Sequence, residues 1–319
     1  MLNHYPKWRD EFVLSREQRA LGRYAELVSD VRRGVLIPAT RGVFRRAASI
    51  ERDPVRHADD AFLARVRATQ LLAGDRELVF AGLAAAAIWQ LPIIGQWPER
   101  VSVATPPAGG GRSNSRIARS YVGHLPPSVA VDSLRVTGLR RTVVDVGRTC
   151  SFEVAVAIAD AALRGQEKTS TRRERAAITI AALARELGLL GSAPGVAKCR
   201  GVLEFADGRS GSPGESLSRV GIHRLGLPAP ELQVPFYDQF GLIGIVDFWW
   251  PHAKLIGEFD GVGKYVREEF ADGRTLAEIV MAEKAREDRL RALGPGVARW
   301  GWTEARSLPA LNAKLAALR

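Results

Sequence analysis

Three carboxylates stand among apolar residues in two short stretches near the C-terminal end of the sequence. Asp247 lies within IVDFWW, and Glu258 and Asp260 lie within LIGEFD. Both stretches are typical of β-strands, in which successive side chains point to opposite faces of the sheet. Alternation therefore places Asp247 on the same face as Ile245, and Glu258 and Asp260 on the same face as Ile256.

Carboxylates on core strands are costly unless a positive group compensates their charge. A divalent cation does so most directly, because Mg²⁺ prefers hard oxygen ligands and keeps several waters for chemistry. We therefore expect Asp247 and Glu258 to bind Mg²⁺ or Mn²⁺.

The elements that must position these carboxylates lie between residues 206 and 319. Gly, Ser and Pro cluster over residues 206–216 and mark a domain boundary. After it we expect a helix with Glu215 in its first turn, an antiparallel meander of three strands, a long helix and a last strand. The expected strands and long helix cover residues 231–238, 242–250, 254–260, 275–294 and 296–302.

The long helix over residues 275–294 carries Glu283 and Glu287 on the stripe that should be buried. Two interpretations remain open. Either these glutamates face the polar site, or they pair with Arg286 or Arg291.

Residues 1–50 have the pattern of a winged helix-turn-helix. A capping box of Ser15 and Gln18 starts a short helix, a second helix follows over residues 24–33, and two strands joined by a tight turn end the unit. Ten Lys or Arg stand against five Asp or Glu here. We expect Arg41, Arg45 and Arg46, at the predicted wing, to contact DNA phosphates or a minor groove. The alternative is a solvated basic hairpin in a protein-binding winged domain.

Residues 51–205 alternate short strands and amphipathic helices and end in a helical connector, so we expect a mixed α/β domain. No cluster of His, Cys or carboxylates in this stretch suggests catalysis. We expect Asp145 and Asp160 to lie on helix surfaces or to act as packing partners. The whole chain is therefore expected to be α/β (α+β), with domains over residues 1–50, 51–205 and 206–319.

Ordered residues in the C-terminal third resemble a known nuclease family. A helix bearing Glu215, then VDF, EFDGVGKY and AEKAREDRLRALG, resembles the C-terminal domain of the Vsr-like PD-(D/E)XK endonuclease superfamily. The stretches RRGVLIPATRGVF and LRRTVVDVGRT resemble proteins with an AbiEi-type antitoxin winged helix, which are common in actinobacteria. Together the two resemblances cover most of the chain.

The nuclease resemblance implies roles for individual residues. Asp247 and Glu258 would be the acidic residues of the second and third core strands, and Glu215 the helix carboxylate that helps to bind the metal. Asp260 stands where the family motif has lysine, a cation that orients or polarises the attacking water. Lys264 and Lys284 are the candidates to supply that cation, and Asp260 would join the metal shell or orient Lys264.

Composition limits the class of protein. The net charge is +11 over 319 residues, which favours a polyanionic partner such as DNA. Cys150 and Cys199 are far apart and have no zinc-ligand spacing, so neither a disulfide framework nor a zinc site is expected. We find no secretory signal and no membrane-length apolar run, and we expect a cytoplasmic protein without a membrane partner.

Two functions follow as hypotheses. The first is a DNA-binding protein whose Mg²⁺-dependent endodeoxyribonuclease-like domain hydrolyses phosphodiester bonds, in phage defence or mobile-element biology. The second is a transcriptional repressor or antitoxin-like regulator of a type IV toxin–antitoxin system, in which the nuclease fold is inactive. Its partners would be DNA and either a cognate toxin or a second copy of the chain.

Overall fold

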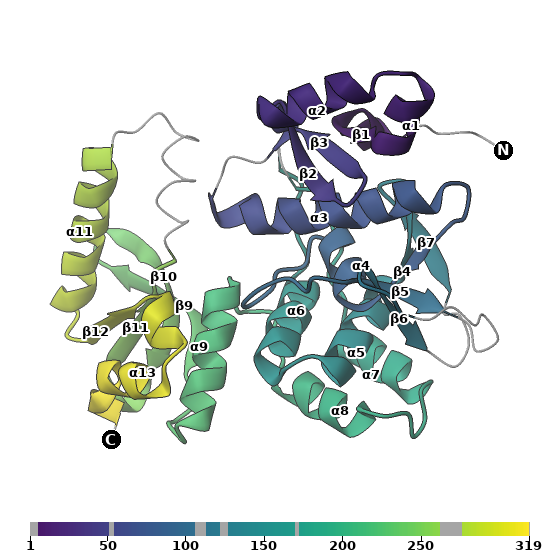
Figure 1. Cartoon of the computed structure of the whole chain (residues 1–319). Helices are drawn as coiled ribbons and strands as arrows, with labels where there is room; N and C mark the ends of the chain where they lie inside the picture. The colour runs from purple at the N-terminus through teal and green to yellow at the C-terminus, as the bar shows by residue number, and fades with distance from the viewer. Residues whose placement is uncertain are drawn as a thin grey trace.

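The computed structural model describes residues 6–50, 54–105, 113–121, 127–169, 172–261 and 276–318. Over these ranges the protein is a mixed α/β fold, as the sequence predicts. Its strands form a three-stranded, a five-stranded and a four-stranded sheet, and helices pack around them (Figure 1). In the described part of the chain, no helix is both long enough and apolar enough to span a membrane.

The N-terminal elements follow the order that the sequence predicts, two helices and then a hairpin, with a short strand before them. They are the 3-10 helix η1 (Lys7–Glu11), β1 (Phe12–Leu14), α1 (Ser15–Ala20), α2 (Tyr24–Arg32), β2 (Leu36–Thr40) and β3 (Val43–Arg46), with the sheet order β1-β3-β2. Helix α1 begins at Ser15, but Leu14 occupies its cap position and makes no side-chain cap bond. The start of the helix is therefore confirmed, whereas the predicted capping box is wrong.

The middle of the chain forms a long helix, α3, and the five-stranded sheet. In chain order its elements are η2 (Ala47–Ser49), α3 (Pro54–Ala73), β4 (Val79–Phe80), α4 (Gly82–Ile88), β5 (Val101–Thr105), β6 (Ile117–Tyr121), β7 (Ser128–Val131) and β8 (Leu134–Thr137). The sheet order is β6-β5-β4-β8-β7. Phe12 and Val43 of the N-terminal sheet share one hydrophobic cluster with Phe62 of α3 and Phe80 of β4. A continuous core therefore runs across residue 50.

A helical layer follows, made of α5 (Leu139–Thr149), α6 (Phe152–Arg164), α7 (Ile180–Gly188) and α8 (Val196–Phe205). Its apolar faces form a second core cluster. Asp145 pairs with Arg141 at 2.9 Å, one helical turn away. Asp160 pairs with Arg219 at 2.8 Å. Both aspartates are buried packing partners, which agrees with the expectation from sequence.

The C-terminal elements are α9 (Pro213–Arg224), β9 (Glu231–Asp238), β10 (Gly241–Trp250), η4 (Pro251–Ala253), β11 (Leu255–Phe259), α11 (Leu276–Ala292), β12 (Gly296–Trp300), α12 (Trp302–Ala305), α13 (Leu308–Lys314) and η5 (Ala316–Leu318). Strands β9, β10 and β11 form the predicted antiparallel meander, and β12 pairs in parallel with β11. Figure 1 shows α11 on one side of this sheet and α9 and α13 on the other.

Helices α6 and α9 join the middle of the chain to the C-terminal sheet. Asp160 on α6 accepts hydrogen bonds from Ser216 and from Arg219 on α9, each at 2.8 Å. Because the carboxylate is buried, these bonds fix α9, and therefore the start of the C-terminal unit, against α6.

Candidate functional site

Asp247 and Glu258 lie opposite each other on neighbouring strands. The antiparallel register pairs Phe248 with Gly257 and Trp249 with Ile256. Continuing this register by one residue brings Asp247 opposite Glu258. The two residues are only 5% and 6% exposed. The prediction that acidic side chains from adjoining strands meet in a buried place is therefore confirmed for this pair.

Asp247 is fixed by two hydrogen bonds. Its Oδ2 accepts from the backbone N–H of Phe259 at 2.9 Å, and its Oδ1 accepts from the side-chain amide of Gln233 at 3.3 Å. The first bond ties the carboxylate of β10 to the backbone of β11 next to Glu258. The Asp247 carboxylate is thus held against the strand that carries Glu258.

Glu215 is held at the start of α9. Ser212 caps the helix by accepting from the backbone N–H of Glu215 at 3.2 Å. The Glu215 carboxylate, which is 3% exposed, accepts from the N–H of Gly211 at 2.6 Å and from Gln233 at 3.0 Å. The amide of Gln233 therefore bridges Glu215 and Asp247.

Sequence reasoning missed Gln233. It lies on β9 between two residues that pair with the neighbours of Asp247, and its backbone has a φ of 55°, in the left-handed region. Such a conformation costs a non-glycine residue about 1–3 kcal/mol and persists only where the surroundings enforce it. Both partners of its side chain are carboxylates, which can only accept, so the NH₂ group must face them. The only signal in the sequence is one polar residue at the start of an apolar strand, which is weak.

Glu258 has a cation from α11 as its partner. Arg286 donates to Glu258 Oε1 at 2.8 Å, to the carbonyl oxygen of Ile245 at 3.1 Å and to Glu283 at 3.1 Å. Burial, reinforced by the charge of Asp247, raises the pKa of Glu258 to about 7, although Arg286 acts in the opposite direction. Arg286 and Arg299 together therefore compensate this carboxylate only in part.

Arg299 completes a charged layer between the sheet and α11. It lies on β12 opposite Glu258 and forms ion pairs with Glu283, with Glu287 at 3.3 Å and with Asp260 at 3.5 Å. Glu283 and Glu287, the two glutamates on the helical stripe, pair with Arg286 and Arg291. The interpretation that they pair with these arginines is therefore confirmed. They also lie beside the polar site, because Glu283 shares Arg286 with Glu258.

The structure corrects the expectation for Lys284. Its side chain is exposed on α11, and the cation that contacts the acidic pair is Arg286, two residues further on. On a helix these two positions point in different directions. Lys264, the other candidate, lies outside the described residues.

The three predicted metal ligands do not form one cluster. Among the described residues, no group of three or more His, Cys, Asp or Glu is arranged to hold a metal ion. Glu215 and Asp247 share the side-chain amide of Gln233. The pair of Asp247 and Glu258 still suits Mg²⁺, which is commonly bound through one or two carboxylates, with water and substrate phosphate completing its shell.

The predicted DNA-contacting arginines have different environments. Arg41 is exposed in the turn between β2 and β3, and Arg46 is exposed on β3. Arg45 is 5% exposed and forms ion pairs with Asp60 at 2.5 Å and with Glu11 at 2.9 Å. Arg45 thus stabilises the packing of the wing on α3 instead of facing a ligand, which corrects its expected role.

No protein-family model matches the sequence. Two curated relatives are similar to part of it: uncharacterized proteins of Mycobacterium tuberculosis strains CDC 1551 / Oshkosh and ATCC 25618 / H37Rv. Each is 36% identical over 121 residues, which are 38% of this chain and 41% of the relative. The match thus spans about two-fifths of the length of these relatives.

Proposed function

We propose that this chain is a DNA-binding protein whose C-terminal unit is an Mg²⁺-dependent endonuclease that hydrolyses phosphodiester bonds. One observation carries the proposal: the carboxylates of Asp247 and Glu258 are buried opposite each other, and Arg286 and Arg299 offset the buried charge of Glu258 only in part. A buried acidic pair of this kind is a site where a divalent cation is bound favourably.

Each residue of the site has a role in this proposal. Asp247 and Glu258 hold Mg²⁺ or Mn²⁺, which when bound neutralises charge on the scissile phosphate and makes water more acidic. Gln233 and Glu215 keep the Asp247 carboxylate in place. Because the pKa of Glu258 is raised to about 7, a metal ion competes with a proton for this carboxylate. If Glu258 binds the metal ion instead of Arg286, Arg286 keeps its ion pair with Glu283.

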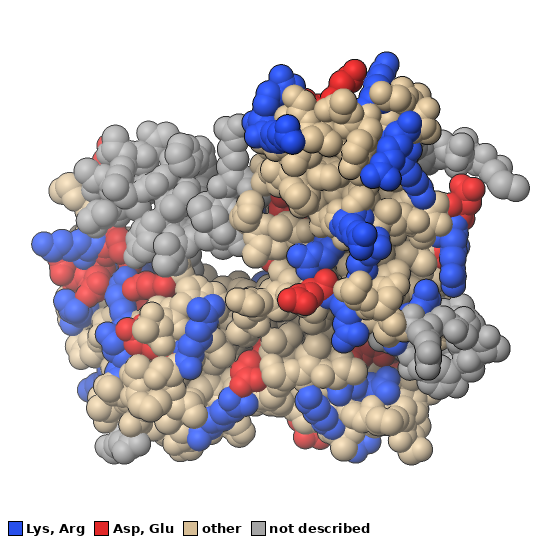
Figure 2. Space-filling view, in the orientation of Figure 1, with Lys and Arg blue, Asp and Glu red and all other residues tan. Residues whose placement is uncertain are grey.

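The charge distribution supports DNA as the partner. The net charge is +11, and Figure 2 shows Lys and Arg side chains gathered over the part of the surface where Figure 1 places α1, α2 and α3. Exposed arginines on such a surface attract phosphates from any sequence of DNA. In this proposal the protein acts in the cytoplasm, where bacterial DNA is found.

A second function is favoured by the Arg286 contact. Because Arg286 bonds Glu258 at 2.8 Å, the acidic pair has a resident cation without any metal. A regulator that keeps the nuclease fold only as a scaffold would have such an arrangement. It would bind DNA as a repressor, with a cognate toxin or a second copy of the chain as its protein partner.

Nicking of supercoiled plasmid distinguishes the two functions. The wild type, Asp247→Asn and Glu258→Gln are compared in Mg²⁺, in Mn²⁺ and in EDTA. Asp238→Asn is the matched control, because Asp238 lies in the same sheet and pairs with Arg289 of α11 at 2.7 Å. Metal-dependent nicking that only the two site variants abolish supports the endonuclease. Salt-dependent binding of plasmid by all four proteins, without nicking at any metal concentration, supports the regulator.

A further inference from the structure

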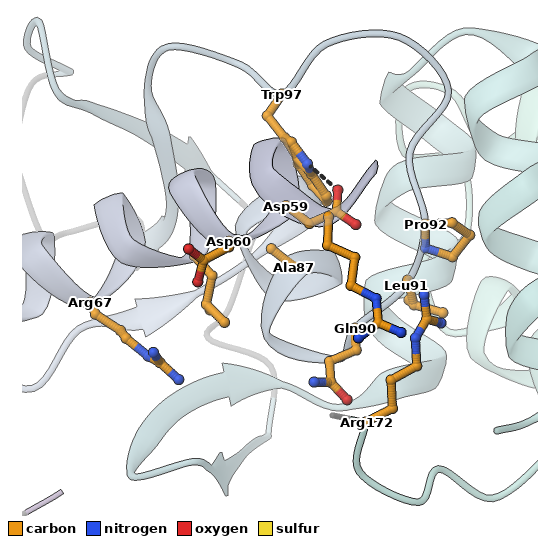
Figure 3. A pocket seen from close by; sticks show the side chains of 11 residues that line it. Asp59, Asp60, Arg67, Ala87, Gln90, Leu91, Pro92, Trp97 and Arg172 are labelled. Carbon is orange, nitrogen blue, oxygen red and sulfur yellow. Dashed lines mark hydrogen bonds between the residues drawn. The ribbon is translucent and has the colours of Figure 1, made fainter. Parts of the chain in front are cut away.

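Two adjoining cavities form a cleft between the middle of the chain and the C-terminal unit. Their volumes are about 250 and 470 Å³, and both are lined by Arg56, Asp59, Gln90, Pro92 and Arg172. Figure 3 shows the smaller cavity beneath α3, with Gln90 between Arg67 and Arg172. We call the larger cavity, which continues to α9 and α12, the inter-unit cleft.

The inter-unit cleft is strongly positive. Its described lining includes five arginines, and Asp59 is its one carboxylate. Asp59 in turn accepts a hydrogen bond from the indole N–H of Trp97 at 2.8 Å. The five arginines are Arg56, Arg164, Arg172, Arg175 and Arg306. Such an excess of one charge in a concave site concentrates anions there.

Arg175 carries a charge that, among the described residues, no carboxylate pairs with. It is 6% exposed, and its described hydrogen bonds go to the backbone carbonyls of Trp89, Gln90, Ala161 and Gly165. Burial, together with the charges of Arg164 and Arg172, lowers the pKa of Arg175 to about 10. A buried arginine held by carbonyl dipoles alone leaves a net positive charge at the floor of the cleft.

The opposite wall of the cleft is aromatic. Trp302 on α12 packs edge-to-face on Phe259, with ring centroids 5.2 Å apart, and Arg306 lies over the Trp302 ring at 4.9 Å. Cationic and aromatic side chains together are what a single nucleic-acid strand requires, because arginines bind its phosphates and aromatic rings stack on its bases. A cavity of about 470 Å³ has the size of a small-ligand site and cannot admit a duplex.

The cleft adjoins the acidic pair through shared residues. Residues 211–213 line the cleft, and the N–H of Gly211 also binds Glu215. Phe259 lines it with its side chain, while its backbone N–H binds Asp247. The cleft therefore reaches the sheet that carries the acidic pair. It does so on the face to which Phe259 points, opposite the face on which Glu258 pairs with Arg286.

We propose that the inter-unit cleft binds an unpaired stretch of a DNA strand. Its phosphates contact Arg56, Arg164 and Arg172, and a base lies against Trp302. Binding stands on the cleft alone, whereas cleavage of the bound strand rests on the proposed function. The substrate is then single-stranded DNA, or a strand locally unpaired from its duplex.

Fluorescence anisotropy in EDTA measures this binding without cleavage. The probes are one labelled oligonucleotide of about 12 nucleotides, alone and annealed to its complement, each titrated with full-length protein over a range of salt. We expect the single strand to bind at least tenfold more tightly than the duplex. Arg172→Gln and Arg56→Gln should each weaken single-strand binding and reduce the salt slope by about 0.7, the value for one lost phosphate contact.

Arg185→Gln is the matched control, because Arg185 is exposed on α7 and does not line the cleft. It should bind like the wild type. Trp302→Leu should reduce single-strand affinity without changing the salt slope, since stacking involves no phosphate charge. Urea unfolding of every variant shows whether the fold is retained. If Trp302→Leu unfolds, the two exchanges of arginine for glutamine still decide the outcome.

Equal affinity for single strand and duplex would overturn the proposal. So would wild-type binding by folded Arg172→Gln and Arg56→Gln, or saturation of the cleft by a mononucleotide with no further gain from a longer strand. The two proposals fail separately. Plasmid that is never nicked, with cleft binding intact, removes the endonuclease alone, and metal-dependent nicking with binding that maps elsewhere removes the cleft alone.

Discussion

Replacement of Glu258 by glutamine tests the electrostatics of the acidic pair directly. Glutamine has nearly the shape of a protonated glutamate and carries no charge. Because burial and Asp247 raise the pKa of Glu258 to about 7, the folded protein holds this proton more tightly than the unfolded chain does. The stabilising contribution is therefore full below pH 4.5, and it is lost as the pH rises through about 7.

The size of the effect follows from the two pKa values. A rise from the usual 4.5 to about 7 corresponds to a change of up to about 3 kcal/mol in the free energy of unfolding. The opposing effect of Arg286 is already contained in the raised pKa. Between pH 4.5 and pH 8, the free energy of unfolding of Glu258→Gln should thus gain up to about 3 kcal/mol relative to that of the wild type.

Urea unfolding in EDTA, followed by tryptophan fluorescence, measures this change. Trp250 and Trp300 are buried in the core of the C-terminal sheet and report on its unfolding. Glu231→Gln, at an exposed position of β9, is the control and should change the free energy of unfolding by less than about 0.5 kcal/mol at either pH. A difference between Glu258→Gln and wild type that is the same at both pH values would refute the assignment of a raised pKa to this residue.

Three further variants test other parts of the structure by urea unfolding. Gln233→Gly should leave the free energy of unfolding within about 1 kcal/mol of wild type, because release of the left-handed strain offsets the lost amide bonds; a loss above about 3 kcal/mol would contradict that strain. Arg45→Ala should lower the free energy of unfolding by about 3–5 kcal/mol, because it removes the buried cation that pairs with Glu11 and Asp60. Arg41→Ala, at an exposed position, should lower it by less than about 0.5 kcal/mol. Equal losses in the two variants would show that Arg45 does not form these ion pairs. Gly214→Ala should lower the free energy of unfolding by about 1–3 kcal/mol or more, because the added methyl group overlaps the ring of Phe259 on β11. Gly201→Ala on α8 is the control: its methyl group meets open space, and it should raise the free energy of unfolding by up to about 1 kcal/mol. A Gly214→Ala protein as stable as the wild type would contradict this packing.

Local patterns in the sequence predicted the strands and the acidic pair. The meander over residues 231–260 follows from three strand-like runs separated by turns, and alternation placed Asp247 and Glu258 on inward faces. The cost of burying carboxylates then required a compensating cation. These steps depend only on neighbours in the chain and on a register that short turns fix, so they could be predicted.

Contacts between distant elements could not be predicted in the same way. Arg286 reaches Glu258 across 28 positions of sequence, and the bridge from Gln233 to Glu215 needs a backbone conformation that no residue type at that position indicates. Arg45 was within reach of sequence reasoning, because strand alternation places it on the same face as buried Val43. Its carboxylate partners on η1 and α3 were not, since nothing local brings those elements together.

The charge on the acidic pair connects the two proposed functions. Arg286 and Arg299 offset the effects of burial and of the Asp247 charge only in part, so the pKa of Glu258 remains raised. Mg²⁺ would compensate the pair more completely, and Arg286 would keep Glu283 as its partner. In the regulator, by contrast, the pair stays partly protonated near neutral pH, with Arg286 as its resident cation. The acidic pair is stable in both cases, so its burial alone does not separate an active nuclease from a scaffold. The two functions differ in whether Asp247 and Glu258 bind a metal ion more favourably than they bind the proton and Arg286 together.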